Sequence, residues 1–381
     1  MNVGFTSGAA RGTSSASSSR HADTNRHARN TMRAYEFTAY GGPEVMRLSE
    51  RADPIAGPTE VVVDIHAAGL NPIDILQRTG TFRFVNPGRF PLVPGNEFSG
   101  TISAIGSSVT GLAVGDAVFA RTDKALLGGL AEKVAIQSEL VARMPRTVDF
   151  ATAAAVPLAG TTALQAITRG LAVVPEDRVL ITAGTSMVGT LEIQLAAHAG
   201  AQVTTTASAH HTVELRRLGA DEVLDYHQHP DHEIPGTYTK IFDLVPGADL
   251  RALLDRTQPG GRLLSVAATP TPGSMRHDYA MPAWRALTLE TVLFLVTARV
   301  RRHAKRRDVH YQRLSMRPDA EDLRTLADLI DSGRLHVPID SRFTFDDAAA
   351  AFARVESRHA KGKVIVDVHR PEADTSDQQQ V

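Results

Sequence analysis

The chain contains no cysteine among its 381 residues, which excludes disulfide bonds, thiol catalysis and every cysteine-ligated metal site. It also lacks an apolar run of the ~20 residues that a membrane-spanning helix needs. The longest candidate, residues 286–298, is too short and is interrupted by Glu290. Net charge is nearly absent, because 41 Lys and Arg residues face 42 Asp and Glu residues. The overall charge therefore gives no reason to expect nucleic acid or an anionic membrane as a partner.

The two ends of the chain lack the periodic apolar pattern of folded segments. Residues 1–31 are rich in Ser, Arg, Ala and His, with Asp23 as the only acid, and this composition predicts disorder. An Arg- and Ser-rich, acid-poor N-terminus is also typical of organelle transit peptides. The preference for Arg over Lys is typical of GC-rich bacterial coding, which favours a flexible leader ahead of Met32 and a cytoplasmic protein. Residues 370–381 are predicted to form a disordered tail.

The most regular pattern lies at residues 178–208, RVLITAGTSMVGTLEIQLAAHAGAQVTTTAS. An apolar, β-branched run at residues 178–183 predicts a buried parallel strand, and residues 184–186 form a turn of small side chains. Residues 187–199 have apolar positions at helical spacing, and Gly200 ends this helix. Residues 202–207 then predict a second strand. Such a unit leaves backbone N–H groups and a helix dipole where a phosphate can bind.

The glycine fingerprint of this unit is imperfect. Gly184, Ser186 and Gly189 stand at the GxGxxG spacing, so the middle glycine is missing. The pattern alone leaves a nucleotide site and a plain packing unit equally open.

Around this unit the pattern of the chain changes twice. From Met32, short β-rich runs alternate with glycine turns, which predicts a compact, mostly antiparallel β domain. Residues 178–266 alternate strands with helices, at strand candidates 222–224, 240–244 and 262–266, and predict a parallel sheet covered by helices on both faces. Further on, helices are predicted at residues 319–332 and 343–357 and a closing strand at 363–368. The fold class is therefore α/β with two domains.

Several segments, taken together, resemble the medium-chain dehydrogenase/reductase superfamily and, within it, the zinc-free quinone oxidoreductase branch. They are AGLNPIDILQRTG (68–80), VPGNEFSGTISAIG (93–106), VGDAVFA (114–120), PLAGTTALQAI (157–167), the turn at residues 184–186 and LGADEVLDY (218–226). The C-terminal segments VHYQRLSMRPDAEDLRTLADLIDSGRLHVPID and VESRHAKGKVIVDV are most similar to the subgroup of the reticulon-interacting mitochondrial protein.

The resemblance implies a division of the chain into domains. A GroES-like catalytic domain would begin at residues 32–157, a Rossmann domain that binds NADP would occupy 158–312, and residues 313–369 would return to the first domain. The active cleft would lie between the two domains. A homodimer is possible in this branch.

The resemblance also addresses zinc, which the alcohol dehydrogenases of this superfamily hold with Cys and His ligands. Their ligand positions resemble Asn71 and Asn96, whose neutral amides are poor zinc ligands. We therefore predict no metal site. Without a metal, the protein has to hold the nicotinamide against an electrophile that accepts hydride readily, such as a quinone or an enone.

By the same resemblance, Asn71 and Thr162 lie beside the nicotinamide as catalytic residues. Their alternatives are a turn-capping amide before Pro72 and a hydroxyl at a helix N-terminus. Asp74 is either a polar residue that lines the pocket or a local cap, and the cap is favoured. His310 and Tyr311 lie at the end of the predicted Rossmann domain and are either pocket residues or core residues.

The predicted cofactor is NADPH. Sites for NAD usually end the second strand with an acid that binds the ribose 2′-OH, whereas this strand ends at Ser208 and no carboxylate follows before Glu214. Ser208 can donate to a 2′-phosphate, with His210 or His211 adding charge. The resemblance adds Tyr226 at the 2′-phosphate and places further residues at the cofactor: Thr185, Ser186, Met187 and Val188 at the pyrophosphate, and Thr162, Ala267, Ala360 and Lys361 elsewhere along it. For Lys361 a solvated surface charge is an equal alternative.

Two other functions stay open. A trans-2-enoyl thioester reductase on the same scaffold would need a pocket Tyr as proton donor, and a nucleotide-binding protein with little catalysis is compatible with the altered glycine turn. The six Lys and Arg residues at 299–307 would suit a membrane surface together with the apolar helix before them. A solvated helix end is favoured over this, with the apolar face packed over the cleft or a subunit interface.

Overall fold

The computed structural model describes residues 31–83, 87–123, 127–269 and 283–369. The predicted tail, and the predicted leader apart from Thr31, lie outside these residues.

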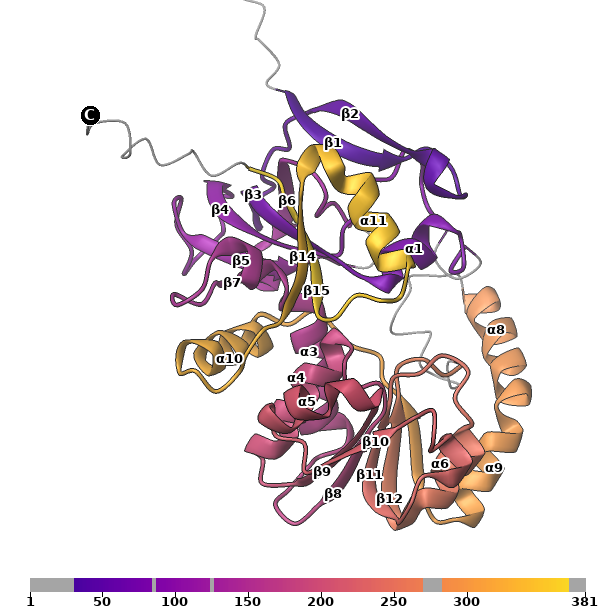
Figure 1. Cartoon of the computed structure of the whole chain (residues 1–381). Coiled ribbons are helices and arrows are strands. Elements are labelled where there is room, and N and C mark those ends of the chain that lie inside the picture. The colour runs from indigo at the N-terminus through magenta and orange to yellow at the C-terminus, as the bar shows by residue number, and fades with distance from the viewer. Residues whose placement is uncertain (1–30, 84–86, 124–126, 270–282, 370–381) are drawn as a thin grey trace, which may run out of the picture.

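One seven-stranded sheet, mostly antiparallel, forms the upper half of the molecule in Figure 1. Its strand order is β14–β15–β3–β4–β5–β7, and β6 pairs with β3 beyond the end of β15. Eleven residues make β3 the longest of these strands, and eight of them are buried because the strand pairs along both edges. A separate hairpin of β1 and β2 packs at the N-terminal end. The strands are β1 (Thr31–Phe37), β2 (Met46–Ala52), β3 (Glu60–Leu70), β4 (Glu97–Ile105), β5 (Ala117–Arg121), β6 (Lys133–Gln137), β7 (Val141–Arg143), β14 (Ile339–Thr344) and β15 (Lys363–Asp367).

The bounds of strand β14 and helix α11 correct one prediction. The helix predicted at residues 343–357 is shorter, because α11 begins at Ala348, after β14 has ended at Thr344. Phe343 instead pairs with Val366 in a parallel ladder between β14 and β15, and the β15 side chains from Val364 to Val366 are buried. Phe343 therefore lies in a strand, because β14 pairs with β15 and β15 pairs in turn with β3 of the sheet.

The second sheet has six parallel strands in the order β10–β9–β8–β11–β12–β13 and lies in the lower half of Figure 1. Every pairing in it is parallel, as the alternation of strands and helices predicts. The strands are β8 (Arg178–Ile181), β9 (Gln202–Ala207), β10 (Glu222–Asp225), β11 (Tyr238–Asp243), β12 (Thr257–Ser265) and β13 (His310–Arg313). The α/β fold class and the Rossmann-like parallel sheet are thereby confirmed, while the domain boundaries stay predictions.

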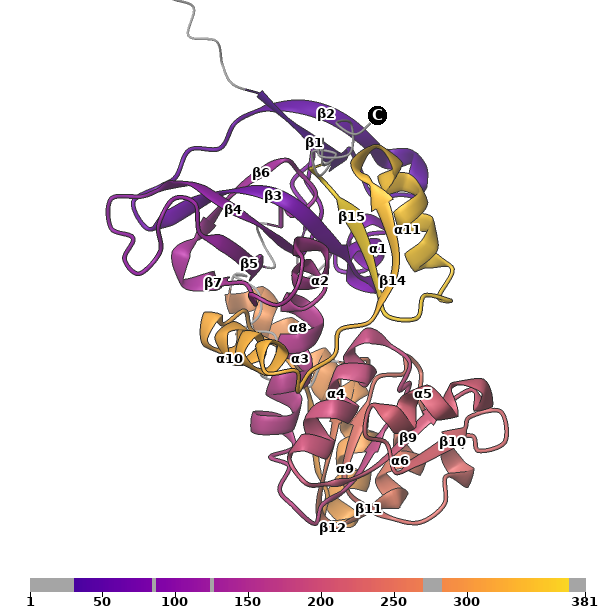
Figure 2. The same cartoon turned by 60° about the vertical axis from the view of Figure 1, so that its left-hand side comes forward.

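Ten α-helices accompany the sheets in the described parts of the chain. They are α1 (Pro72–Arg78), α2 (Phe150–Ala154), α3 (Pro157–Gln165), α4 (Met187–His198), α5 (Thr212–Arg217), α6 (Leu250–Arg256), α8 (Ala283–Val296), α9 (Ala298–Arg306), α10 (Ala320–Asp331) and α11 (Ala348–Glu356). Both cartoon views place α3 and α10 between the two sheets (Figures 1 and 2). One apolar core runs through this region, from Ala67 and Phe119 of the first sheet to Val179 and Ile181 of the second.

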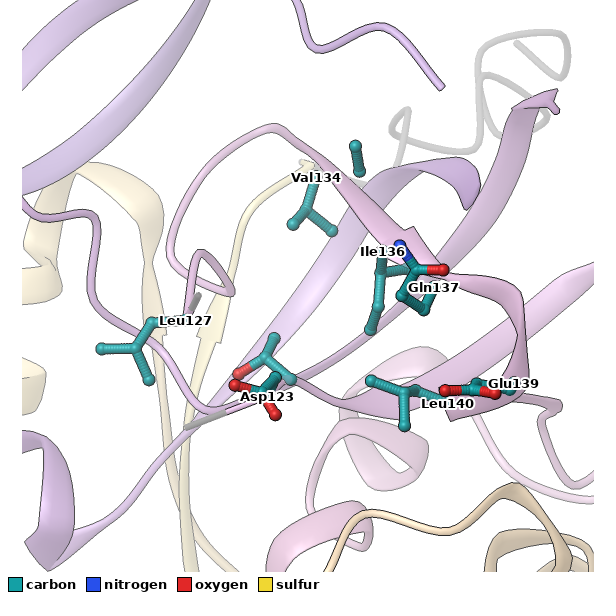
Figure 3. A pocket seen from close by; sticks show the side chains of 9 residues that line it. Asp123, Leu127, Val134, Ile136, Gln137, Glu139 and Leu140 are labelled. Carbon is teal, nitrogen blue, oxygen red and sulfur yellow. The ribbon is translucent and has the colours of Figure 1, made fainter. Parts of the chain in front are cut away.

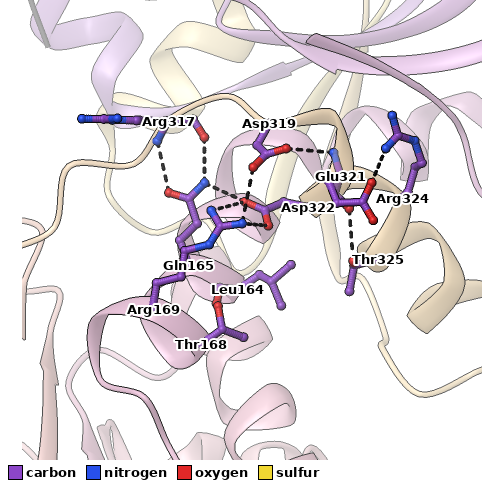
Figure 4. A network of polar contacts seen from close by, with 10 residues as sticks. All are labelled: Leu164, Gln165, Thr168, Arg169, Arg317, Asp319, Glu321, Asp322, Arg324 and Thr325. Carbon is purple, nitrogen blue, oxygen red and sulfur yellow. Dashed lines mark hydrogen bonds and ion pairs between the residues drawn. The ribbon is translucent and has the colours of Figure 1, made fainter. Parts of the chain in front are cut away.

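A buried carboxylate joins the two helices of this junction. Asp322 of α10 accepts hydrogen bonds from Nε2 of Gln165 at 2.7 Å and from Arg169 at 2.8 and 3.1 Å (Figure 4). Gln165 also donates to the carbonyl of Arg317 at 2.8 Å and accepts from its N–H at 3.1 Å. These bonds fix α10 on α3, and the chain then returns to the first sheet.

The apolar run at residues 286–298 falls on α8 and the start of α9. No helix in the described ranges is long and apolar enough to cross a membrane. Tyr311 packs with the apolar side chains around β11 and β12, so of its two interpretations the structure favours the core. Burial, with the negative charge of Asp243, raises the pKa of Tyr311 to about 12.

Candidate functional site

The turn between β8 and α4 is tightly packed. Ala183 has a left-handed backbone with φ +52°, a conformation that side chains disfavour and that marks local strain. A Cβ atom on Gly184 would lie 2.2 Å from Oγ1 of Thr205, and one on Gly189 would lie 2.5 Å from the carbonyl oxygen of Ala183. Both remaining glycines of the fingerprint are thus required by close packing of helix on strand.

Ser186 takes the N-cap position of α4. Its hydroxyl accepts from the N–H of Gly189 at 3.1 Å, and its own N–H donates to the carbonyl of Ala183 at 3.0 Å. The serine at the middle glycine position therefore secures the turn itself, and its N–H is not available to a phosphate. The N–H groups of Thr185, Met187 and Val188 have no hydrogen-bond partner within the described residues. The side chain of Met187 packs into the apolar core, which removes its bulk from the open side of the turn.

Ser208 and Tyr226 meet at the carboxyl ends of β9 and β10. The Ser208 hydroxyl donates to the Tyr226 hydroxyl at 3.1 Å, and Tyr226 is exposed. His210 is exposed beside them, whereas His211 is buried and its Nδ1 lies 3.4 Å from Oε2 of Glu214. Of the two histidines, His210 is the one accessible to a ligand. The structure thus brings together the two hydroxyls that the sequence analysis assigned to one 2′-phosphate.

A buried carboxylate also lies at the carboxyl ends of β8, β11 and β12. Asp243 accepts from the hydroxyls of Ser265 at 2.7 Å and Thr182 at 3.2 Å and from the N–H of Val245 at 3.0 Å. Burial raises its pKa. This cluster ties three neighbouring strands together at the edge where parallel sheets bind ligands. Ala267 is the second residue after β12 and is half-buried at this edge.

Asn71 is buried at the N-cap of α1, and its side chain is held at both ends. Its Nδ2 donates to Oε1 of Glu97 at 2.8 Å, and its Oδ1 accepts from Nζ of Lys363 at 2.6 Å. Lys363 also forms a close ion pair with Oε1 of Glu97, and both charged side chains are at most 2% exposed. The Asn71 amide is therefore fixed in one orientation by a buried pair of opposite charges.

Glu97 connects Asn71 to Thr162. Its second carboxylate oxygen accepts from the N–H of Leu158, in the first turn of α3, at 2.6 Å. Thr162, buried one turn further along, donates its hydroxyl to the carbonyl of Leu158 at 2.7 Å. Glu97 thus contacts Asn71 directly and is linked to Thr162 through Leu158, although the two predicted catalytic residues are 91 positions apart in the sequence.

Asn96 and Asp74 form a second polar pair beside this cluster. Nδ2 of Asn96 donates to Oδ1 of Asp74 at 2.7 Å, and the N–H of Asn71 donates to Oδ2 at 2.8 Å. The interpretation of Asp74 as a cap is confirmed. Complete burial raises the pKa of Asp74 to about 6, against the hydrogen bonds that lower it.

Ala360 and Lys361 lie in the loop between α11 and β15. Ala360 is half-buried, while Lys361 is exposed and its backbone N–H donates to Asp340 at 2.7 Å. Nothing in the described structure ties the Lys361 side chain to the other predicted residues. The buried lysine that contacts Asn71 lies two residues on, at Lys363, and sequence reasoning missed it. Glu97 was missed as well, although it adjoins Asn96 within the quoted motif.

One cavity of about 170 Å³ is lined by none of the predicted site residues. Apolar side chains of β6 and its surroundings line it, together with Asp123 and Glu139 (Figure 3). Its lining residues are Thr122, Asp123, Leu127, Val134, Ala135, Ile136, Gln137, Glu139 and Leu140. The N–H and the hydroxyl of Thr122 donate to the backbone carbonyl of Asn96 and leave the Asn96 side chain to Asp74. We therefore do not assign the cavity to the site.

Two family models match the chain. Residues 57–146 match the alcohol dehydrogenase GroES-like domain, and residues 218–366 match the zinc-binding dehydrogenase family. Together with the relatives below, these matches establish that the chain belongs to the medium-chain dehydrogenase/reductase superfamily.

Within the superfamily, the similarity is to quinone and alkenal reductases. The chain is 31% identical over 346 residues to the chloroplastic NADPH-dependent alkenal/one oxidoreductase of Arabidopsis thaliana, covering 88% of this chain and 79% of the relative. It is 32% identical over 363 residues to the mitochondrial NAD(P)H oxidoreductase RTN4IP1 of Danio rerio, covering 89% and 92%. The solved quinone oxidoreductase from Coxiella burnetii superposes with a TM-score of 0.77 at 28% identity, covering 89% of this chain and all of that one.

Proposed function

We propose that the protein is an NADPH-dependent oxidoreductase that reduces quinones or other α,β-unsaturated carbonyl compounds without zinc. The observation that carries the proposal is the buried Asn71 amide between Lys363 and Glu97, at a position that the resemblance matches to a ligand of the zinc-dependent relatives. The names of the relatives support the electrophile, since they include alkenal, quinone and 2-methylene-furan-3-one reductases.

The residues at this position do not fit zinc. Zinc prefers thiolate and imidazole ligands, whereas Asn71 and Asn96 offer amides. The Asn71 oxygen already accepts from the Lys363 ammonium, a cation that would repel a second cation. Among the described residues no group of three His, Asp or Glu side chains is placed to hold a metal ion. We therefore propose no step through a metal, although one matching family model is named for zinc.

NADPH fits the second sheet. The partnerless N–H groups of Thr185, Met187 and Val188, at the positive end of α4, would hold the pyrophosphate. Ser208 and Tyr226 would hold the 2′-phosphate, since their two hydroxyls meet at 3.1 Å and β9 ends without a carboxylate. Asp225, the last residue of β10, accepts from the N–H of His227 at 3.0 Å. Bound NADPH supplies a hydride to an electron-poor carbon.

The chain's own residues would then orient the reactants and exclude water. The amide of Asn71 and the hydroxyl of Thr162 are both buried. Glu97 holds Asn71 directly and holds the first turn of α3, to which the Thr162 hydroxyl donates. The two groups would therefore be preorganised beside the reactants. Ala267, Ala360 and Lys361 remain proposed cofactor contacts. A cytoplasmic location and a homodimer also remain proposals.

Steady-state turnover tests this function directly. NADPH oxidation is measured against a panel of quinones, enones and enoyl thioesters, before and after treatment with a chelator. We expect turnover with quinones or enones and unchanged rates after chelation. Stoichiometric zinc in active enzyme, with activity lost on its removal, would contradict the zinc-free part of the proposal.

The same panel separates the alternatives. Turnover confined to enoyl thioesters would favour the thioester reductase. Tight NADPH binding with no turnover on any compound would favour a nucleotide-binding protein with little catalysis.

A further inference from the structure

Helix α8 presents an unusual number of apolar side chains to solvent. Trp284, Leu287 and Leu295 are each more than half exposed, and Phe294, Val292 and Val296 are at least half exposed. Figure 1 shows α8 along the outer side of the molecule, with α9 continuing below it. Among the described residues, no helix or strand covers Leu287, Val292 and Leu295, which stay at least half exposed.

The helix following α8 presents unpaired cations. In α9, Arg299 and Arg302 are exposed, and so are Lys305 and Arg306. None of these four side chains has an ion pair or a hydrogen bond within the described structure, whereas the neighbouring His303 and Arg307 both contact the carboxylate of Asp255. The sequence analysis favoured a solvated helix end here, but it could not show which cations are paired.

The apolar and cationic side chains share one side of a nearly continuous helix. The N–H of Thr297 donates to the carbonyl of Leu293 at 2.9 Å, and the N–H of Arg301 donates to that of Thr297 at 3.0 Å, so helical bonding runs through the junction. Because an α-helix has about 3.6 residues per turn, a continuous helix places regularly spaced side chains in one stripe along its surface. It contains Trp284, Leu287, Leu295, Arg299, Arg302 and Arg306, and we call it the α8–α9 face. The opposite side carries the buried Leu293, Thr297 and Ala304.

We propose that the α8–α9 face binds the surface of a bilayer that contains anionic phospholipids. Apolar side chains next to unpaired Arg and Lys residues are the combination by which a helix lies in a membrane interface, with its cations on lipid phosphates. The chain as a whole is close to neutral, so this attraction is local to α9. The proposal is independent of the proposed reductase activity, because binding is measured without cofactor or substrate.

A second copy of the chain fits this face less well. In a symmetric dimer the same patch meets itself, which would bury unpaired cations of two α9 helices together. Charge complementarity instead favours an anionic partner, and the adjoining apolar stripe favours a lipid phase over a soluble polyanion.

The single tryptophan of the chain makes this testable. Trp284 lies on the α8–α9 face, so its fluorescence reports directly on what covers that face. Vesicles of phosphatidylcholine alone are compared with vesicles of equal parts phosphatidylcholine and phosphatidylglycerol, by co-sedimentation and by tryptophan emission. We expect binding and a blue shift with the anionic vesicles only, both weakened by added salt.

Two variants and one matched control locate the contact. Arg302→Gln with Arg306→Gln should weaken binding to anionic vesicles by roughly 30-fold, and Leu287→Ser with Leu295→Ser should abolish the blue shift. Arg216→Gln with Arg217→Gln removes two exposed arginines from α5, on another side of the second sheet, and should leave binding unchanged. Thermal melting confirms that each variant is folded.

Three outcomes would overturn the proposal. One is absence of binding to anionic vesicles, and another is equal loss of binding in the α5 control. The third is a blue shift that depends on protein concentration and not on lipid, which would assign the face to a second copy.

Discussion

Ser208 and Tyr226 show how little separates two cofactor specificities at the scale of single residues. Their hydroxyls meet at 3.1 Å although they are 18 residues apart. A carboxylate at the end of β9 would repel a 2′-phosphate, and a hydroxyl there can donate to it. We therefore expect the preference for NADPH to depend on the residue that occupies position 208.

Ser208→Asp should remove most of the preference for NADPH over NADH. A charge-assisted hydrogen bond contributes ~1.5–3 kcal/mol, so two such bonds should favour NADPH by roughly 10²-fold or more in the unaltered protein, at about 1.4 kcal/mol per tenfold. Titration of both nucleotides measures the ratio. Ser107→Asp, which adds the same charge on an exposed turn of the first domain, should not change it. An unchanged ratio in Ser208→Asp would mean that the 2′-phosphate binds elsewhere.

Lys363 and Glu97 illustrate a different dependence, in which each charge is tolerated only because the other is present. Lys363→Met should lower the free energy of unfolding by about 3–5 kcal/mol, because Glu97 would remain buried without its cation. Lys361→Met changes an exposed lysine two residues away and should stay within about 0.5 kcal/mol. Combining Lys363→Met with Glu97→Gln should recover part of the loss, and denaturant unfolding measures these variants together with the single Glu97→Gln. A double variant as unstable as the sum of the singles would show that the two charges do not interact.

At the scale of elements, the junction of α3 and α10 decides how the two sheets are held. Asp322 is buried where α10 meets the end of α3, and it accepts three hydrogen bonds from Gln165 and Arg169 (Figure 4). The carboxylate binds one neutral and one charged donor at once, so it fixes the orientation of α10 more firmly than apolar contacts alone.

Asp322→Asn should lower the free energy of unfolding by about 1–3 kcal/mol, because an amide cannot accept all three of these hydrogen bonds. Asp328→Asn makes the same change at an exposed position of the same helix, so its effect should stay within about 0.5 kcal/mol. Chemical denaturation of the two variants compares them directly. Equal effects would show that the Asp322 bonds contribute nothing beyond the helix itself.

At the scale of the whole molecule, the folded unit is expected to begin at Met32. In β1, Thr31 pairs only with Ala52 at the exposed end of a hairpin, while Ala34 and Phe37 are fully buried. A chain that starts at Met32 should therefore melt within about 2 °C of the full chain and bind NADPH equally well. Differential scanning calorimetry and nucleotide titration test this, and a fall of many degrees would show that residues 1–31 are structural.

Local pattern was sufficient for much of this protein. The strand, turn, helix and second strand at residues 178–208 follow from the spacing of apolar side chains, because periods of 2 and 3.6 residues depend only on the chain itself. The family resemblance, carried by short motifs in one order, extended this to the α/β fold and its two kinds of sheet.

Long-range contacts decided the rest. Lys363 reaches Asn71 across 292 residues of sequence, and no local pattern distinguishes it from the exposed Lys361. Phe343 fits a helical pattern, yet the ladder with Val366 places it in a strand. Whether a charge is paired and whether an apolar face is covered depend on what packs against them, so the buried ion pair and the α8–α9 face emerged only from the tertiary structure.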